Sequence, residues 1–139
     1  MNARPPFRAD HVGSLLRPKA LLDARERYAK QEIGAAELRQ VEDRHIRDAV
    51  KLQEDLGLKA VTDGEYRRTY FHIDFLEKLE GVSVTGGLQV KFHTHAGDVA
   101  MVPQKLEVTG KLRRTQPIQV DDFAYLKSVA KATPKVCIP

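Results

Sequence analysis

Cysteine, tryptophan and long hydrophobic stretches are scarce in this sequence. Among 139 residues there is one cysteine, Cys137, and no tryptophan, and aromatic residues make up only 6%. A single cysteine cannot form an internal disulfide, and the amino-terminal residues lack the apolar stretch of a secretory signal, so we expect a cytoplasmic protein. Its apolar runs are far shorter than the roughly eighteen residues that a membrane span needs, which predicts no contact with a membrane.

Charge of one sign is not concentrated anywhere along the chain. The 23 lysines and arginines exceed the 19 acidic residues by four, and the excess is spread without a long basic run. Nucleic-acid-binding proteins usually combine a basic stripe with stacking aromatic residues. The sequence therefore predicts no nucleic-acid partner. A composition of 42% hydrophobic and 30% charged residues is typical of a globular domain with a core.

Helical and alternating patterns follow each other along the chain. Apolar residues at helical spacing predict a short helix between Pro18 and Gly34, a long helix over 35–56, a helix over 70–80, and a last helix that begins at Asp121 and ends before Thr133. Short apolar stretches predict strands over 7–12, 58–62 and 135–138. Alternating residues on both sides of a glycine- and proline-containing stretch predict a β-hairpin around 82–113.

Strands that alternate with helices are typical of parallel βα units. A closed eight-stranded barrel needs about 250 residues, whereas this chain has 139. We therefore interpret residues 1–139 as one α/β domain, the N-terminal part of a (β/α)8 TIM barrel with about three βα units and an inserted hairpin. A small open α/β sheet is the alternative.

Two short motifs follow the first two expected strands. His11-Val-Gly-Ser14 and Thr62-Asp-Gly-Glu65 both stand where α/β proteins place their ligands, at the carboxyl ends of parallel strands. Gly13 lets the backbone approach a ligand closely, Ser14 donates or accepts a hydrogen bond, and Glu65 is suited to an ammonium group. Ordinary turns are the simpler interpretation of the same residues.

Other polar residues near these motifs have two interpretations each. His11 titrates near neutrality and is a candidate acid or base, or it points into the barrel wall. Arg17 either binds a carboxylate or sulfonate or forms a structural salt bridge. Asp63 orients a charged neighbour or caps the following turn. His93 and His95 lie two apart on an expected strand and either share a metal or face solvent.

The two motifs resemble a known family in the wider stretches that contain them. The stretches 8–18 (RADHVGSLLRP) and 56–67 (LGLKAVTDGEYR) are similar to the start of the catalytic barrel in cobalamin-independent methionine synthases, and especially to their shorter single-barrel relatives. The similarity continues through the expected helix, hairpin and the stretch 106–112 in the same order. It therefore covers nearly the whole chain.

This resemblance implies a zinc-dependent methyltransferase that methylates homocysteine or a similar thiol to form methionine. A reduced folate is the implied methyl donor, and zinc converts the thiol to a thiolate that attacks the methyl group. The residues that match the family's amino-acid site are Val12, Gly13, Ser14 and Glu65. The stretch 99–103 lacks the Arg-Cys pair that contacts folate in the family, so the donor is left open.

The metal ligands that the resemblance implies do not fall within this chain. In the family they are a histidine, two cysteines and an acid on later barrel strands, and Cys137 matches none of them. The chain by itself is therefore expected to contribute substrate contacts, to hold no zinc and to be inactive. Open strand edges predict that it associates with a second copy or with the remainder of a barrel.

Two other functions remain open at this point. A related zinc-thiolate enzyme acting on coenzyme M would use Arg17, Arg67 or Arg68 to hold the sulfonate, whereas Glu65 favours an amino acid. A noncatalytic α/β module that acts through self-association is the third hypothesis.

Overall fold

The computed structural model describes residues 10–87, 89–95 and 97–139, which divide into two compact units. The first unit consists of the described residues up to Phe71 together with Gln119–Pro139, and the second is His72–Ile118. The first unit contains α1 (Lys19–Ala29), α2 (Ala35–Asp55), β1 (Ala60–Val61), α4 (Val120–Val129) and β6 (Thr133–Pro134). It is an α/β unit, as expected.

Helix α2 is the long helix that the sequence predicts over 35–56. Its buried residues recur every three or four positions and form one face, consisting of Glu42, Ile46, Ala49, Val50 and Gln53. Gly57 ends the helix with φ +82°. The N–H groups of Gly57 and Leu58 donate to the carbonyls of Glu54 and Gln53, which satisfies the last turn of the helix in a Schellman motif.

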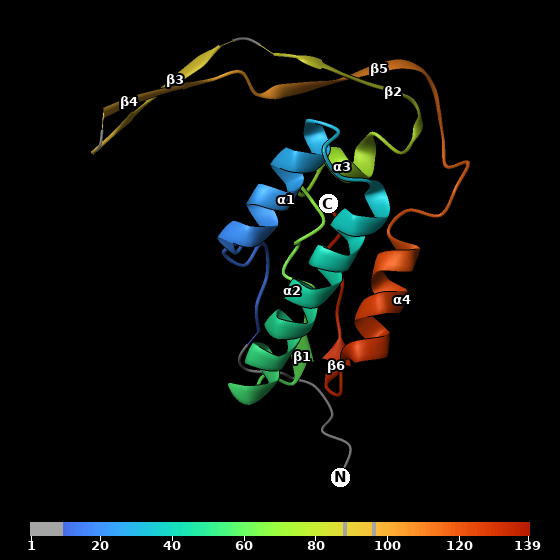
Figure 1. Cartoon of the computed structure of the whole chain (residues 1–139). Coiled ribbons are helices and arrows are strands. Elements are labelled where there is room, and N and C mark those ends of the chain that lie inside the picture. Colours follow the sequence, from blue (N-terminus) through green and yellow to red (C-terminus); the bar gives the residue numbers. More distant parts are fainter. Residues whose placement is uncertain (1–9, 88, 96) are drawn as a thin grey trace. The chain divides into compact units, whose positions relative to one another are not determined.

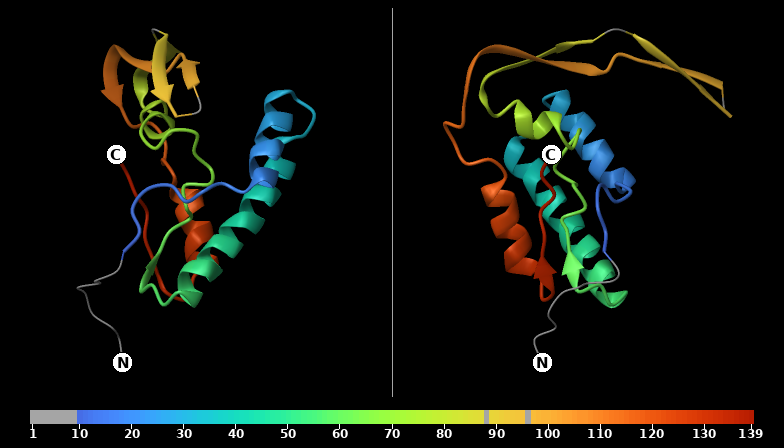
Figure 2. Two further views of the ribbon diagram at one scale, coloured as in Figure 1. Left: turned by 90° about the vertical axis from the view of Figure 1, so that its left-hand side faces the viewer. Right: turned by 180° about the vertical axis from the view of Figure 1, so that it is seen from behind.

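A small apolar core joins the three helices of the first unit. Its buried members are Leu21, Ile46, Ala49, Val50, Val61, Tyr66 and Leu126. Helix α1 contributes Leu21, and α4 contributes Leu126, which is 1% exposed. Helices α2 and α4 lie on the same face of the strand pair β1–β6, with β1 and β6 side by side (Figures 1 and 2). This is the helix-on-sheet packing of an α/β protein.

The parallel sheet is smaller than the sequence predicts. Strands β1 and β6 pair in parallel with Ala60 opposite Thr133 and Val61 opposite Pro134. The prediction of a strand over 135–138 was wrong, because pairing ends just before it, although the Lys135 N–H still donates to the Val61 carbonyl at 2.8 Å.

The expected first strand is also absent from the described residues. Residues 7–9 of that prediction lie outside them, and 10–18 is irregular. It is held by isolated contacts instead of a ladder, such as the Leu15 N–H donating to the Gly64 carbonyl at 3.1 Å. The described part of the chain therefore has two parallel strands where three were predicted.

The second unit is built around two antiparallel strand pairs. β2 (Glu80–Gly86) pairs with β5 (Gln104–Arg113), and β3 (Val90–Thr94) pairs with β4 (Gly97–Met101). These pairs correspond to the hairpin predicted around 82–113. Alternation explains the pairing, because Val82 faces Val108 and Phe92 faces Val99 across neighbouring strands.

The helix predicted over 70–80 was wrong for most of its length. Only the four residues of α3 (Ile73–Leu76) are helical, and turns surround them. Strand β2 already begins at Glu80, where Gly81 has φ +87° and lies close to the carbonyls of Gly110 and Lys111. The end of the predicted helix is instead part of the strand that pairs with β5. The helix therefore stays short, despite the helical spacing of Phe71, Phe75 and Leu79.

In the described part of the chain, no helix has both the length and the apolar character needed to cross a membrane.

Candidate functional site

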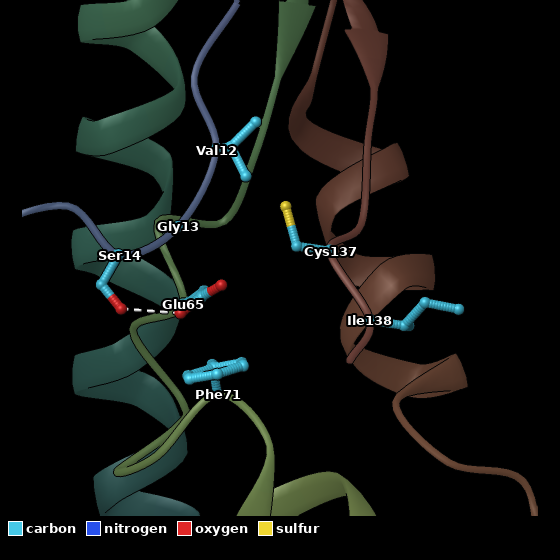
Figure 3. A pocket seen from close by; sticks show the side chains of 7 residues that line it. All are labelled: Val12, Gly13, Ser14, Glu65, Phe71, Cys137 and Ile138. Atoms are coloured by element: carbon cyan, nitrogen blue, oxygen red, sulfur yellow. Dashed lines mark hydrogen bonds between the residues drawn. The ribbon is translucent and has the colours of Figure 1, made fainter.

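A cavity of about 370 Å3 lies in the first unit beside the two sequence motifs. Its lining consists of Val12, Gly13, Ser14, Glu65, Phe71, Cys137 and Ile138. Figure 3 shows that these residues come from three separate segments: the one before α1, the loop after β1, and the chain end after β6. The four residues assigned to substrate through the family resemblance, Val12, Gly13, Ser14 and Glu65, are thus brought to one cavity.

The Thr62–Glu65 loop directs Glu65 toward the cavity through two successive left-handed residues. Gly64 has φ +66° and Glu65 has φ +56°. The Thr62 hydroxyl accepts a hydrogen bond from the Gly64 N–H at 3.1 Å, and the Asp63 carboxylate accepts one from the Glu65 N–H at 3.0 Å. A glutamate with positive φ is uncommon, and these side-chain contacts fix it in that conformation.

Gln53 connects the loop to the long helix α2. The Gln53 amide nitrogen donates to the carbonyls of Ala49 and Thr62 at 3.0 and 2.9 Å, and its oxygen accepts from the Thr62 N–H at 3.0 Å. Both Gln53 and Thr62 are almost fully buried. Just after β1 ends, the Gln53 side chain therefore pairs with the Thr62 N–H and carbonyl, as a neighbouring strand would.

The two motifs are also bonded directly to each other. The Ser14 hydroxyl donates to Glu65 Oε2 at 2.6 Å (Figure 3). The Tyr66 hydroxyl donates to the Leu16 carbonyl at 3.0 Å. Gly64 leaves little room between the segments, since a Cβ atom there would lie 3.1 Å from the Leu15 side chain. These contacts explain why the motifs, about fifty residues apart in sequence, form one wall.

Three further predicted site residues support this wall from outside the cavity lining. The His11 ring nitrogen is 2.8 Å from the Gly13 carbonyl, so His11 stabilises its own loop. Arg17 donates to the backbone carbonyls of Glu65 and Arg68, at 3.2 and 2.6 Å. Asp63 is buried and caps the turn, and burial raises the pKa of the Asp63 carboxyl above its ordinary value of 3.8.

Three residues that complete the cavity were not predicted: Phe71, Cys137 and Ile138. Arg68, a candidate anchor for a sulfonate, instead contacts Glu65 and the Cys137 carbonyl. The rule that ligands gather at the carboxyl ends of parallel strands applies equally to the segment after β6. Applied there, it would have indicated Cys137 and Ile138. Nothing in the sequence alone indicates Phe71.

Neighbouring Arg67 has a separate role in packing the helices. Its side chain, 5% exposed, lies 2.9 Å from the Glu42 carboxylate and 3.2 Å from that of Asp122, and it also bonds to Asp43. The guanidinium stacks 5.2 Å from the centre of the Tyr125 ring. Burial would lower the pKa of Arg67, but the bonds to Asp43 and Glu42 outweigh it and raise that pKa. Arg67 therefore joins α2 to α4 and does not face the cavity.

The donor atoms of the cavity do not make up a zinc site. They include one thiol, Cys137, and one carboxylate, Glu65, of which Oε2 is already bonded to Ser14. Among the described residues, no three His, Cys, Asp or Glu side chains cluster in a way that could hold a metal ion. At the hairpin tip, His93 pairs with Asp98 at 2.6 Å, and this exposed pair has no third ligand among those residues.

Comparison with known families decides the ancestry of the chain. The family described as the catalytic domain of cobalamin-independent synthase matches residues 7–135. The chain belongs to this family. The resemblance carried by the two motifs is thereby confirmed, and the cavity lies where those motifs meet.

Relatives with this ancestry are longer than the present chain. The uncharacterised protein YxjH of Bacillus subtilis is 41% identical over 98% of this chain and 36% of its own length. A 5-methyltetrahydropteroyltriglutamate–homocysteine methyltransferase of Synechococcus is 29% identical over 89% of this chain and 16% of its own length. The chain thus spans little more than a third of the longer protein even in the first case.

A solved structure supports the arrangement of the elements. The protein is from Listeria monocytogenes and is described as a candidate vitamin-B12-independent methionine synthase. It superposes with a TM-score of 0.75 at 38% identity, over 99% of this chain and 37% of the Listeria chain.

Proposed function

We propose that this chain forms the amino-acid-binding part of a methyltransferase that methylates homocysteine or a similar thiol to give methionine. The observation that carries the proposal is the buried carboxylate of Glu65, which is 3% exposed and meets Ser14 at the cavity wall. A buried carboxylate favours a cationic ligand group, and a substrate ammonium supplies both the charge and the hydrogen-bond donors that such a site requires.

The remaining lining suits the rest of such a substrate. Val12, Phe71 and Ile138 are apolar and line the cavity together with Glu65. A short aliphatic chain carrying sulfur would contact these side chains, and sulfur packs favourably against an aromatic ring such as Phe71. The family membership supports the same substrate class, because relatives such as the Synechococcus protein are named as homocysteine methyltransferases.

A sulfonate substrate such as coenzyme M is less well supported. The three arginines considered for it are committed to other partners: Arg17 to backbone carbonyls, Arg67 to acidic residues of the helices, and Arg68 to Glu65 and the Cys137 carbonyl. None of the three is part of the cavity lining. An anionic head group would therefore face a carboxylate, which is unfavourable.

Zinc and a folate methyl donor belong to the proposal for the whole methyltransferase. Zinc would activate the substrate thiol as a thiolate. The described residues of this chain do not supply its ligand set, so their role in the reaction is to bind and orient the amino-acid end of the thiol substrate. Glu65 and Ser14 would hold the ammonium, and the apolar lining would exclude water from the aliphatic chain.

Binding of the reaction product tests this proposal on the chain as it is. We expect calorimetric titration to show that L-methionine binds more tightly than 4-(methylthio)butanoate, which differs only by lacking the amino group. Glu65→Gln should remove most of this preference, because a charge-assisted hydrogen bond contributes about 1.5–3 kcal/mol, or roughly ten- to a hundredfold in affinity. Glu37→Gln, on the exposed surface of α2, is the matched control. Equal affinities of the two compounds for the wild-type chain would contradict the proposal.

A further inference from the structure

One buried arginine contacts two walls of the cavity at once. Arg68 is 5% exposed, and its Nη1 atom donates to the Cys137 carbonyl at 2.7 Å. The same nitrogen lies 3.7 Å from Glu65 Oε1. Glu65 and Cys137 both line the cavity, but they come from the loop after β1 and the segment after β6. A single guanidinium therefore connects the carboxylate to the wall formed by Cys137 and Ile138.

The two oxygens of the Glu65 carboxylate have different surroundings. Oε2 accepts a hydrogen bond from the Ser14 hydroxyl at 2.6 Å. Oε1 is 3.7 Å from Arg68, which is too long for a hydrogen bond but close enough for strong attraction between buried opposite charges. The negative charge is thus balanced while Oε1 keeps its capacity to accept hydrogen bonds from a ligand.

The backbone of Arg68 is fixed independently of its side chain. Its carbonyl accepts hydrogen bonds from Arg17 at 2.6 Å and from Arg25 at 2.9 Å. Its N–H donates to the Glu65 carbonyl at 3.1 Å. With the main chain held in this way, the guanidinium has a defined position relative to the carboxylate.

We propose that Arg68 is a positioning residue of the amino-acid site, which holds the Glu65 carboxylate with Oε1 open to a substrate ammonium and keeps the Cys137 wall at the matching distance. This inference rests on the proposed function. Other charged or titratable groups that bond to Glu65, line the cavity or hold Arg68 include Arg17, which bonds to the Glu65 backbone, Asp63, which bonds to the Glu65 N–H, the Cys137 thiol, and Arg25, which bonds to the Arg68 carbonyl. Arg17 and Arg25 carry positive charge, and both donate hydrogen bonds to backbone carbonyls.

Two substitutions of Arg68 separate the effect of its positive charge from that of its hydrogen-bonding shape. Arg68→Gln removes the positive charge and retains an amide donor, whereas Arg68→Lys retains the charge. We expect the preference for L-methionine over 4-(methylthio)butanoate to be about tenfold smaller in Arg68→Gln than in the wild-type chain, because the guanidinium that positions Glu65 Oε1 against the Cys137 wall is gone. Arg68→Lys should retain the wild-type preference, as should the control Arg44→Gln on the exposed face of α2.

A second measurement needs no ligand. At one fixed pH, the NMR signals of the Glu65 carboxyl carbon and the Cys137 carbonyl carbon should both move in Arg68→Gln and keep their wild-type positions in Arg68→Lys. Arg68→Lys decides the question if Arg68→Gln has lost its helical circular dichroism. Signals that move in Arg68→Lys, or that are unchanged in a folded Arg68→Gln, would overturn the inference. A failure of the proposed function would give a different result: the wild-type chain would bind L-methionine and 4-(methylthio)butanoate with equal affinity.

Discussion

The hydrogen bonds of Gln53 to Thr62 lead to a prediction about stability. Gln53→Leu keeps a side chain of similar size but removes the donor and the acceptor that pair with the buried N–H and carbonyl of Thr62. Each buried polar group left unpaired costs about 1–3 kcal/mol, and the leucine recovers part of this through apolar burial. We expect a net loss of about 2–4 kcal/mol, a large share of the roughly 5–15 kcal/mol typical of a domain.

Urea unfolding followed by circular dichroism measures this loss. At a slope of about 2 kcal/mol per molar urea, in the middle of the usual range, the midpoint should fall by about 1–2 M. Gln40→Leu is the matched control, because Gln40 is exposed on the same helix and should change the free energy of unfolding by less than about 0.5 kcal/mol. A Gln53→Leu variant as stable as the control would refute the reasoning that this side chain replaces a strand partner.

Two further predictions concern the loop that carries Glu65. Gly64→Ala should destabilise the chain by about 1–2 kcal/mol, because alanine disfavours φ +66° and its methyl group would crowd Leu15. The control Gly86→Ala should not destabilise it, because Gly86 has open space around it and an ordinary φ. Equal urea midpoints for the two variants would contradict this prediction. Burial raises the pKa of the Asp63 carboxyl, so the folded chain holds the carboxyl proton more tightly than the unfolded chain does. The protonated carboxyl therefore stabilises the fold at low pH. This contribution declines as pH rises from the ordinary pKa of 3.8 through the raised pKa of the folded chain. Asp63→Asn, whose amide oxygen can still accept from the Glu65 N–H, should remove that decline from urea midpoints measured at several pH values, and an unaltered pH dependence would count against it.

The fold could be predicted from the sequence where a pattern is long or ends in a glycine. Helix α2 is predicted nearly to the residue, because its buried stripe spans several turns and Gly57 ends it. The hairpin follows from alternation that is repeated on both sides. The prediction of a helix over 70–80 was wrong, because the apolar pattern there spans few turns and strand β2 begins at Glu80. Local periodicity cannot reveal such competition between a helix and strand pairing.

The cavity was predictable only in part, for a related reason. Glycines and short polar side chains after expected strands indicated Gly13, Ser14 and Glu65, and the family resemblance strengthened that assignment. The role of Gln53 depends on its bonds to Thr62, where the chain turns back along α2, and the role of Arg68 depends on its bond to Cys137, which is distant in sequence. No spacing rule encodes those partners. Association with a second copy or with further barrel segments stays a prediction.

We propose above all that the loops of Ser14 and Glu65 bind the amino-acid end of a sulfur-containing substrate in one cavity. The most direct measurement is an NMR titration of the backbone amides of the chain with L-methionine. We expect the largest chemical-shift changes at Gly13, Ser14, Glu65 and Cys137, and we expect them to vanish with 4-(methylthio)butanoate. Changes that fall elsewhere, or that are the same for both compounds, would contradict it.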